Sequence, residues 1–108
     1  MDRREELFLQ IMRLANNTGA TDEHRALNYL AVRYPALYAF TAERHAHNYA
    51  LTAIEVRPSY LSGARKIVEV IFSYTHRQTN VTDKYFVRVD VTEEFPHLVT
   101  NVSPYYDR

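Results

Sequence analysis

The feature that most constrains the fold is a pair of long segments, residues 65–74 and 85–92, in which every second residue from Val68 to Tyr74 and from Tyr85 to Val91 is apolar. This two-residue period is typical of a β-strand with one buried face. The polar stretch 77–80 separates the segments and predicts a turn. We therefore expect an antiparallel hairpin that is covered on one face only. Its predicted core positions are Val68, Val70, Phe72, Tyr74, Tyr85, Val87, Val89 and Val91.

Two further strands extend this hairpin. Residues 49–57 place Ile54 and Val56 on one face and charged residues on the other. Residues 98–102 form a short apolar run with a proline on either side. Because proline lacks the backbone N–H that a central strand would use, this run predicts an edge strand.

The first half of the chain predicts helices. Residues 2–15 carry apolar side chains at helical spacing, and the polar stretch that follows ends in Gly19, which suits a left-handed helix cap. Thr21 is placed to cap a second helix. Pro35 cannot donate the backbone hydrogen bond of a mid-helix residue, so we expect a break just before it. A third helix then runs from Pro35 to about residue 44 and buries Leu37, Phe40 and Tyr38.

Together these elements predict one α+β domain over residues 1–108. Two or three N-terminal helices pack on one face of a three- to four-stranded antiparallel β-meander. A chain of 108 residues fits a single domain and is long enough to bury a core. Its 46% hydrophobic and 24% charged residues are ordinary for a globular protein and argue against disorder.

Charge and cysteine content exclude several classes of function. The 13 basic and 13 acidic residues cancel, which argues against a dedicated nucleic-acid binder. The chain has no cysteine, so disulfides, thiolate metal sites and cysteine nucleophiles are excluded. No segment approaches the roughly 20 apolar residues of a membrane span, and the charged N-terminus lacks the apolar core of a signal peptide. We expect a soluble, cytoplasmic protein that binds neither nucleic acid nor membrane.

No catalytic motif is present. Gly19 and Gly63 are the only glycines, so a phosphate-cradling or dinucleotide-binding loop cannot be built. None of the four serines has the flanking glycines of a nucleophile elbow. We therefore predict that the domain is not an enzyme, with no catalytic residue and no cofactor.

His45 and His47 are the one candidate for metal binding. On a strand, a His-x-His pair places both rings on the same side, where they can present two nitrogens to zinc. A further ligand would have to come from His24, His76, His97, a carboxylate or a second subunit. The competing interpretation is a pair of solvated histidines at a helix–strand junction, one of them beside the helix C-terminus. We prefer the latter and predict no metal ligand. A zinc-binding domain or metal-dependent accessory enzyme using His45 and His47 stays as an alternative.

The charged face of the sheet is the best candidate binding surface. Its charges alternate in sign across neighbouring strands, a pattern typical of cross-strand ion pairs. We expect Ile67, Ile71 and Phe86 to be exposed among them, and exposed apolar residues indicate contact with a partner. Two C-terminal tyrosines are expected to add to this surface. The predicted binding residues are Glu55, Arg57, Glu69, Arg88, Asp90, Tyr105 and Tyr106.

Two stretches of the chain resemble a known family. They are LNYLAVRYPALYA and LTAIEVRPSYLSGARKIVEVIFSYTHRQTNVTDKYFVRVDVTEEFPHLVTNVSPYYDR. They are similar to the C-terminal domain of unknown function of PatG-type cyanobactin maturation proteases, and a related domain ends the PatA-type proteases. The resemblance runs from about residue 26 to residue 108.

The resemblance implies a parent protein whose subtilisin-like part cleaves a ribosomal precursor peptide and closes it into a ring. The subtilisin Asp, His and Ser motifs are absent here, so no catalytic role carries over. What remains is a non-catalytic interaction or assembly domain of cyanobactin biosynthesis. Its expected partners are a second copy in a homodimer, other domains of a cyanobactin protease, or the precursor peptide. A purely structural role in folding of the parent protease is a further alternative.

Overall fold

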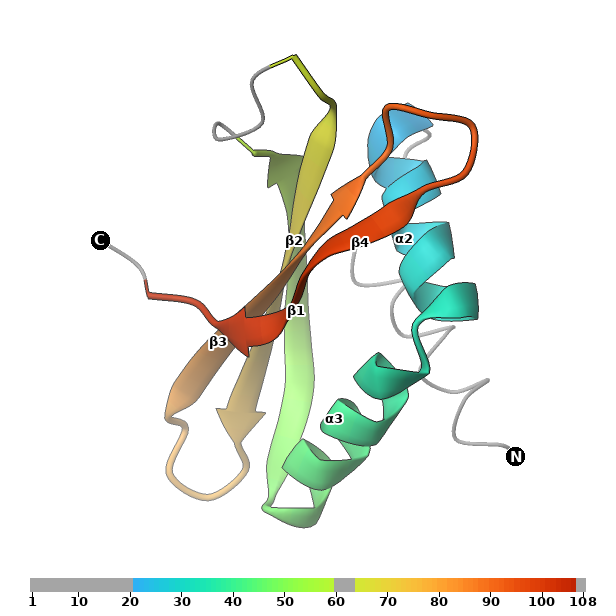
Figure 1. The fold of residues 1–108 in the computed structure, drawn as a ribbon. Helices are drawn as coiled ribbons and strands as arrows, with labels where there is room; N and C mark the ends of the chain where they lie inside the picture. The colour runs from blue at the N-terminus through green and yellow to red at the C-terminus, as the bar shows by residue number, and fades with distance from the viewer. Residues whose placement is uncertain (1–20, 60–63, 107–108) are drawn as a thin grey trace.

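The computed structural model describes residues 21–59 and 64–106 and has an α+β fold (Figure 1). Within the described residues, two helices precede four antiparallel strands that pair in sequence order, β1-β2-β3-β4. The expected helix over residues 2–15 and its cap at Gly19 lie outside the described residues. The elements are α2 (Thr21–Arg33), α3 (Pro35–Ala46), β1 (Tyr49–Pro58), β2 (Ile67–His76), β3 (Thr82–Asp90) and β4 (His97–Pro104).

The predicted break between two helices is confirmed. Helix α2 ends at Arg33, and α3 begins at Pro35, which occupies its first turn, where an N–H donor is not needed. The backbone N–H of Leu37 donates to the Tyr34 carbonyl at 3.1 Å and closes that first turn. Asp22 and Glu23 lie in the first turn of α2, at the positive end of its dipole.

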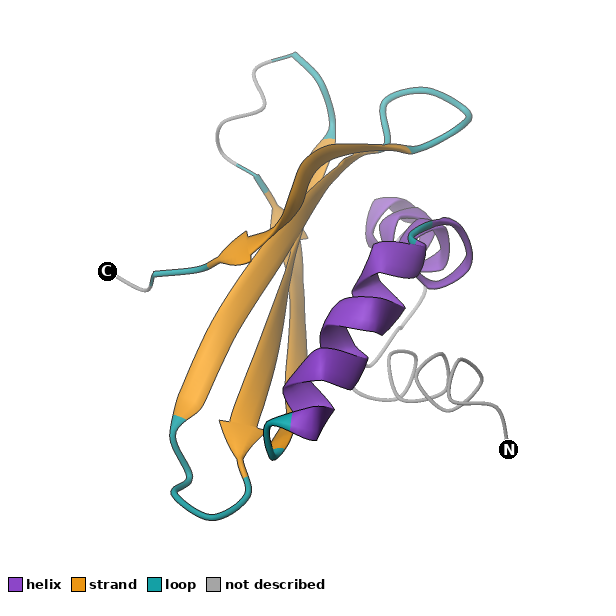
Figure 2. Cartoon of the chain, turned by 60° about the horizontal axis from the view of Figure 1, so that its bottom comes forward, coloured by secondary structure: helices purple, strands orange, loops and turns teal. Residues whose placement is uncertain are grey.

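Both helices lie on the same side of the sheet (Figure 2). Helix α3 packs mainly against β1, and α2 packs against β2. The core between the layers is made by the leucines of the helices and by the inward side chains of the strands, as the alternation predicts. Its fully buried large side chains are Leu27, Leu30, Leu37, Val70, Phe72, Tyr74, Val87, Val89 and Val91.

An aromatic cluster joins the end of α3 to the sheet. Phe40 meets Tyr74 and Tyr85 edge to face, with ring centroids 5.7 and 4.7 Å apart. The guanidinium of Arg44 lies over Phe40, Tyr85 and, at 5.1 Å, Tyr49. Arginine suits this position because its flat cation stacks on rings and is weakly hydrated.

The strands differ from the sequence expectations mainly at their ends. Strand β2 covers residues 67–76 rather than 65–74, and β4 runs beyond the expected 98–102 at both ends. A bulge between Leu51 and Ala53 shifts the register of β1 against β2. Period counting does not reveal such a bulge, because the extra residue interrupts the alternation for one step only.

Neither described helix is long and apolar enough to cross a membrane.

Candidate interaction surface

The sheet face that α2 and α3 leave uncovered carries the predicted alternation of charges. Pairing between the strands places Arg57 opposite Glu69 and Glu69 opposite Arg88. Arg57 Nε donates to Glu69 Oε1 at 3.1 Å. Arg88 Nε donates to Glu69 Oε2 at 3.2 Å. One carboxylate is thus held between two guanidinium groups, and we call Arg57, Glu69 and Arg88 the charge ladder.

Glu69 is the buried centre of the charge ladder, with only 7% of its surface exposed. The Nη2 atoms of Arg57 and Arg88 also lie 3.1 and 3.2 Å from Oε1 and Oε2, so each arginine directs two nitrogens at one oxygen of the carboxylate. Glu55 stands at the exposed end, 3.3 Å from Nη1 of Arg57. Because a buried carboxylate needs such compensation, this geometry fixes both arginines in place.

Two aromatic rings complete the charge ladder. Tyr105 accepts a hydrogen bond from Arg57 Nη2 at its hydroxyl, and its ring lies 5.4 Å from the same guanidinium. The Phe86 ring meets Tyr105 edge to face at 5.9 Å and lies 4.7 Å from the Arg88 guanidinium. The hydrogen bond to Tyr105, followed by that to Glu69, raises the pKa of the Arg57 guanidinium. The contacts with Arg57 and Phe86 leave Tyr105 half-buried, whereas Tyr106 beside it is exposed.

The expectation of exposed apolar residues on this face is wrong. Ile71 is only 3% exposed, and Ile67 and Phe86 are partly buried. Ile71 lies between Glu55 and Phe86 in the pairing of the strands. Long side chains on neighbouring strands reach across a sheet face, and alternation alone does not report that cover.

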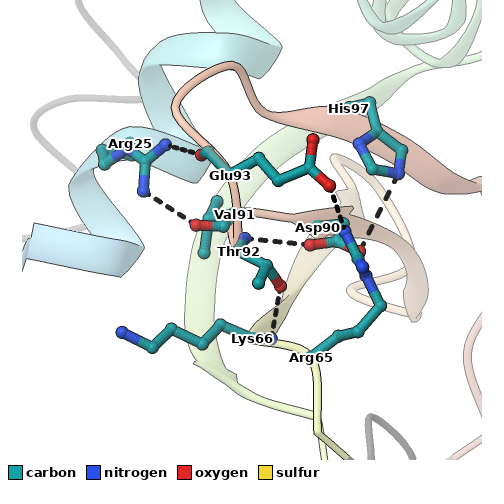
Figure 3. Close-up of polar contacts among 8 residues, drawn as sticks. All are labelled: Arg25, Arg65, Lys66, Asp90, Val91, Thr92, Glu93 and His97. Atoms are coloured by element: carbon teal, nitrogen blue, oxygen red, sulfur yellow. Dashed lines mark hydrogen bonds and ion pairs between the residues drawn. The ribbon is translucent and has the colours of Figure 1, made fainter.

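Asp90 belongs to a second polar cluster, separate from the charge ladder (Figure 3). Its carboxylate is 2% exposed, accepts hydrogen bonds from Arg65 and from the Thr92 backbone N–H at 2.9 Å, and lies 3.8 Å from His97 Nε2. The Arg65 contact, with help from Thr92, holds the pKa of Asp90 well below its usual range. The carboxylate is therefore ionised at neutral pH and ties the end of β3 to the segment before β2.

Arg25 fixes the loop that follows Asp90, residues 91–96 (Figure 3). Its guanidinium donates to the carbonyls of Val91 and Glu94 at 2.8 Å each, and also to that of Glu93. This role was not predicted from the sequence, because Arg25 lies on a helix 66 residues from the nearest of these acceptors. No local pattern indicates a contact of that separation.

His45 and His47 are not presented on a strand. His45 lies within α3, and His47 follows the last helical residue. The Nδ1–H of His47 donates to the Glu43 carbonyl at 2.9 Å, and its backbone N–H bonds to Glu43 and Arg44. His47 thus satisfies carbonyls at the helix C-terminus, as the preferred interpretation expects. Within residues 21–59 and 64–106 no three histidine or acidic side chains gather as a metal-binding group would.

The fold and this face define a small α+β domain with a charge-paired, uncovered sheet. A family model described as PatG C-terminal matches residues 2–105, and the chain belongs to that family. The family associates the chain with cyanobactin biosynthesis, and its description sets this domain apart from a protease part. Comparisons with curated proteins and with solved structures gave no match.

Proposed function

We propose that this chain is a non-catalytic interaction domain of cyanobactin biosynthesis that recruits the precursor peptide through the uncovered sheet face. The observation that carries the proposal is the charge ladder with its two rings, which stands ordered on a face that neither described helix covers. Ordered charged and aromatic side chains lose little conformational entropy when they bind a polypeptide.

The proposal of a non-catalytic role is supported by how the two buried acidic groups, Glu69 and Asp90, are used. Glu69 is saturated by two arginines, and Asp90 by Arg65 and Thr92. A general acid or base needs a proton-transfer position open to a substrate atom. Both carboxylates instead hold strands and loops together, which suits a rigid recognition surface.

Calorimetric titration of the domain with its pathway's precursor peptide tests this proposal. Tyr105→Ala removes the ring that covers Arg57, and Glu55→Lys reverses the exposed charge of the face. If Tyr105 is an anchor, its loss weakens binding by about tenfold or more. Val81→Ala, in an exposed position before β3, is the matched control and keeps the affinity of the unchanged domain.

Three results would contradict the proposal. They are no heat of binding with the precursor peptide, equal affinity in all three variants, or loss of binding in the Val81→Ala control. Circular dichroism of each variant separates a loss of binding from a loss of fold.

Self-association through β4 is a second candidate. Strand β4 is an edge strand, and its sequence HLVTNVSP contains no Lys, Arg, Asp or Glu. Charged residues are a common means of preventing edge strands from pairing, and the exposed Val99 adds apolar area here. Val99→Lys should shift a dimer to monomer in light scattering. A strict monomer before the substitution rules this candidate out.

Reconstituting the pathway with and without the domain distinguishes recruitment of the precursor peptide from a purely structural role. Cleavage and ring closure are followed separately. A recruitment role predicts slower processing at low precursor concentration. A folding role predicts a lower yield of protease with an unchanged rate per molecule.

A further inference from the structure

A groove lies on the helical side of the domain, between α2 and the loop from β3 to β4. Figure 1 shows this loop beside α2, and the hydrogen bonds of Arg25 join the two. The groove is open to solvent and has a volume of about 730 Å³. Its lining residues are Arg25, Asn28, Tyr29, Val32, Arg33, Phe95 and Pro96.

Two apolar side chains in the lining of the groove are largely exposed to solvent. Phe95 is 79% exposed and Val32 is 69% exposed, and they stand on opposite walls. Tyr29 lies one turn from Val32 along α2, and Pro96 follows Phe95. Tyr29 and Pro96 are partly buried. Isolated apolar residues on a surface need no explanation, but two largely exposed apolar side chains that face each other beside two partly buried ones indicate a binding site.

The wall that carries Phe95 is fixed rather than loose. Arg25 holds three carbonyls of residues 91–94. Thr92 Oγ1 accepts from the Lys66 N–H at 2.7 Å, and Arg65 Nη2 lies 3.2 Å from a carboxylate oxygen of Glu93. These contacts hold the loop, and Phe95 with it, in one position before a ligand binds. Binding at Phe95 therefore does not have to order the loop.

The charge of the groove is positive. Among the described residues that line it, Arg25 and Arg33 are the only ionisable groups apart from Tyr29, and none is acidic. The guanidinium of Arg25 is turned to backbone carbonyls, and it makes no ion pair with a carboxylate of residues 21–59 or 64–106. Arg33 is exposed and makes no ion pair with the residues that the structure describes.

We propose that this groove is a second docking site, for an acidic polypeptide segment of a partner protein. An apolar side chain of the segment packs between Phe95 and Val32, and a carboxylate beside it pairs with Arg33. The charge complementarity of the groove selects an acidic segment over a basic one. This site lies on the helical side of the domain and does not depend on the proposed role of the charge ladder.

Two synthetic peptides with blocked ends test the inference, GDDLFDDG and its counterpart GKKLFKKG. Each is titrated into the uniformly ¹⁵N-labelled chain while backbone amide shifts are followed. The acidic peptide should move the amides of residues 25–33 and 93–95, with an affinity about tenfold or more above that of the lysine peptide.

Charge reversal makes the test sharper. Arg33→Glu should weaken the acidic peptide and strengthen the lysine peptide, and it leaves the fold intact because Arg33 is exposed. Phe95→Ala should weaken the acidic peptide about tenfold. Arg77→Glu and Val81→Ala, both at exposed positions around the turn between β2 and β3, are the matched controls and should change neither affinity.

Equal binding of the two peptides, shifts outside the groove, or no shift at millimolar peptide would each overturn the inference. Tyr105→Ala separates this site from the uncovered sheet face. It should weaken the precursor peptide and leave GDDLFDDG binding unchanged, so failure of one site is distinguishable from failure of the other.

Discussion

Two buried carboxylates, Glu69 and Asp90, organise the polar side of this sheet. Each is almost without contact to water, and each is held by arginine. Removing one partner of a buried ion pair leaves the other charge buried without compensation. The stability lost in this way exceeds the net stability that the intact pair contributes. The arginines here stay partly open to solvent and recover some hydration, so the cost is moderated.

Glu69→Gln tests this reasoning. The amide keeps the shape of the side chain but loses the charge that both guanidinium groups require. We expect the free energy of unfolding to fall by about 1–3 kcal/mol. Glu55→Gln, at the exposed end of the charge ladder, should change it by no more than about 1 kcal/mol. Urea unfolding monitored by circular dichroism measures both, and equal effects would contradict a central role for Glu69.

Among the secondary structure elements, the junction of α2 and α3 does more than reverse the chain. Tyr34, the residue between the helices, is buried, and its hydroxyl accepts from the Val102 N–H of β4 at 3.1 Å. The helix break that Pro35 causes therefore positions a side chain that satisfies one backbone donor of β4. The loop between β3 and β4 depends in the same way on Arg25 of α2.

Tyr34→Phe should leave the Val102 N–H without its acceptor and lower the free energy of unfolding by about 1–3 kcal/mol. Hydrogen exchange at the Val102 amide should accelerate more than exchange in β2. Tyr29→Phe is the control, because it removes a tyrosine hydroxyl from the adjoining helix α2 without breaking a described bond to a strand. Unchanged exchange at Val102 would show that this bond is not significant.

Arg25→Met keeps the aliphatic length of the side chain and removes the three hydrogen bonds to the loop. We expect lower NMR order parameters for the backbone amides of residues 92–95, with little change in the core strands. The comparison is Arg33→Met, on the same helix, which should leave the loop unchanged. A loop that stays equally ordered would mean that Asp90 and Thr92 suffice to hold it.

The whole molecule is a two-layer structure whose stability should fall at both ends of the pH range. At acid pH the relevant group is Asp90, whose pKa lies below its usual range because of Arg65. Its contribution is complete above about pH 4 and is lost as the pH falls through the folded-state value. At alkaline pH the relevant group is Tyr74 in the core, where burial raises the pKa from 10.0 to about 12.

The free energy of unfolding should therefore decline between pH 10 and about 12, because the unfolded chain releases the Tyr74 proton first. Tyr74→Phe should remove much of that alkaline decline. Asp90→Asn should lower stability at neutral pH and flatten the curve below pH 4. Urea unfolding at a series of pH values measures both. A wild-type alkaline slope that is unchanged in Tyr74→Phe would contradict the assignment to Tyr74.

Patterns among residues close in the sequence predict the class of fold and the order of its helices and strands. Alternation set the inward side chains of β2 and β3, Pro35 set the helix break, and the sign of the charges set the partners Arg57, Glu69 and Arg88. These features depend on residues close in the chain, or on the two-residue period of paired strands.

Packing in three dimensions decided which of those groups are buried and which distant contacts form. It covered Ile71, separated Asp90 from the charge ladder, and brought Arg25 to the loop that holds Phe95. Burial and long-range hydrogen bonds depend on neighbours from other elements, and the sequence pattern of a single element does not contain them.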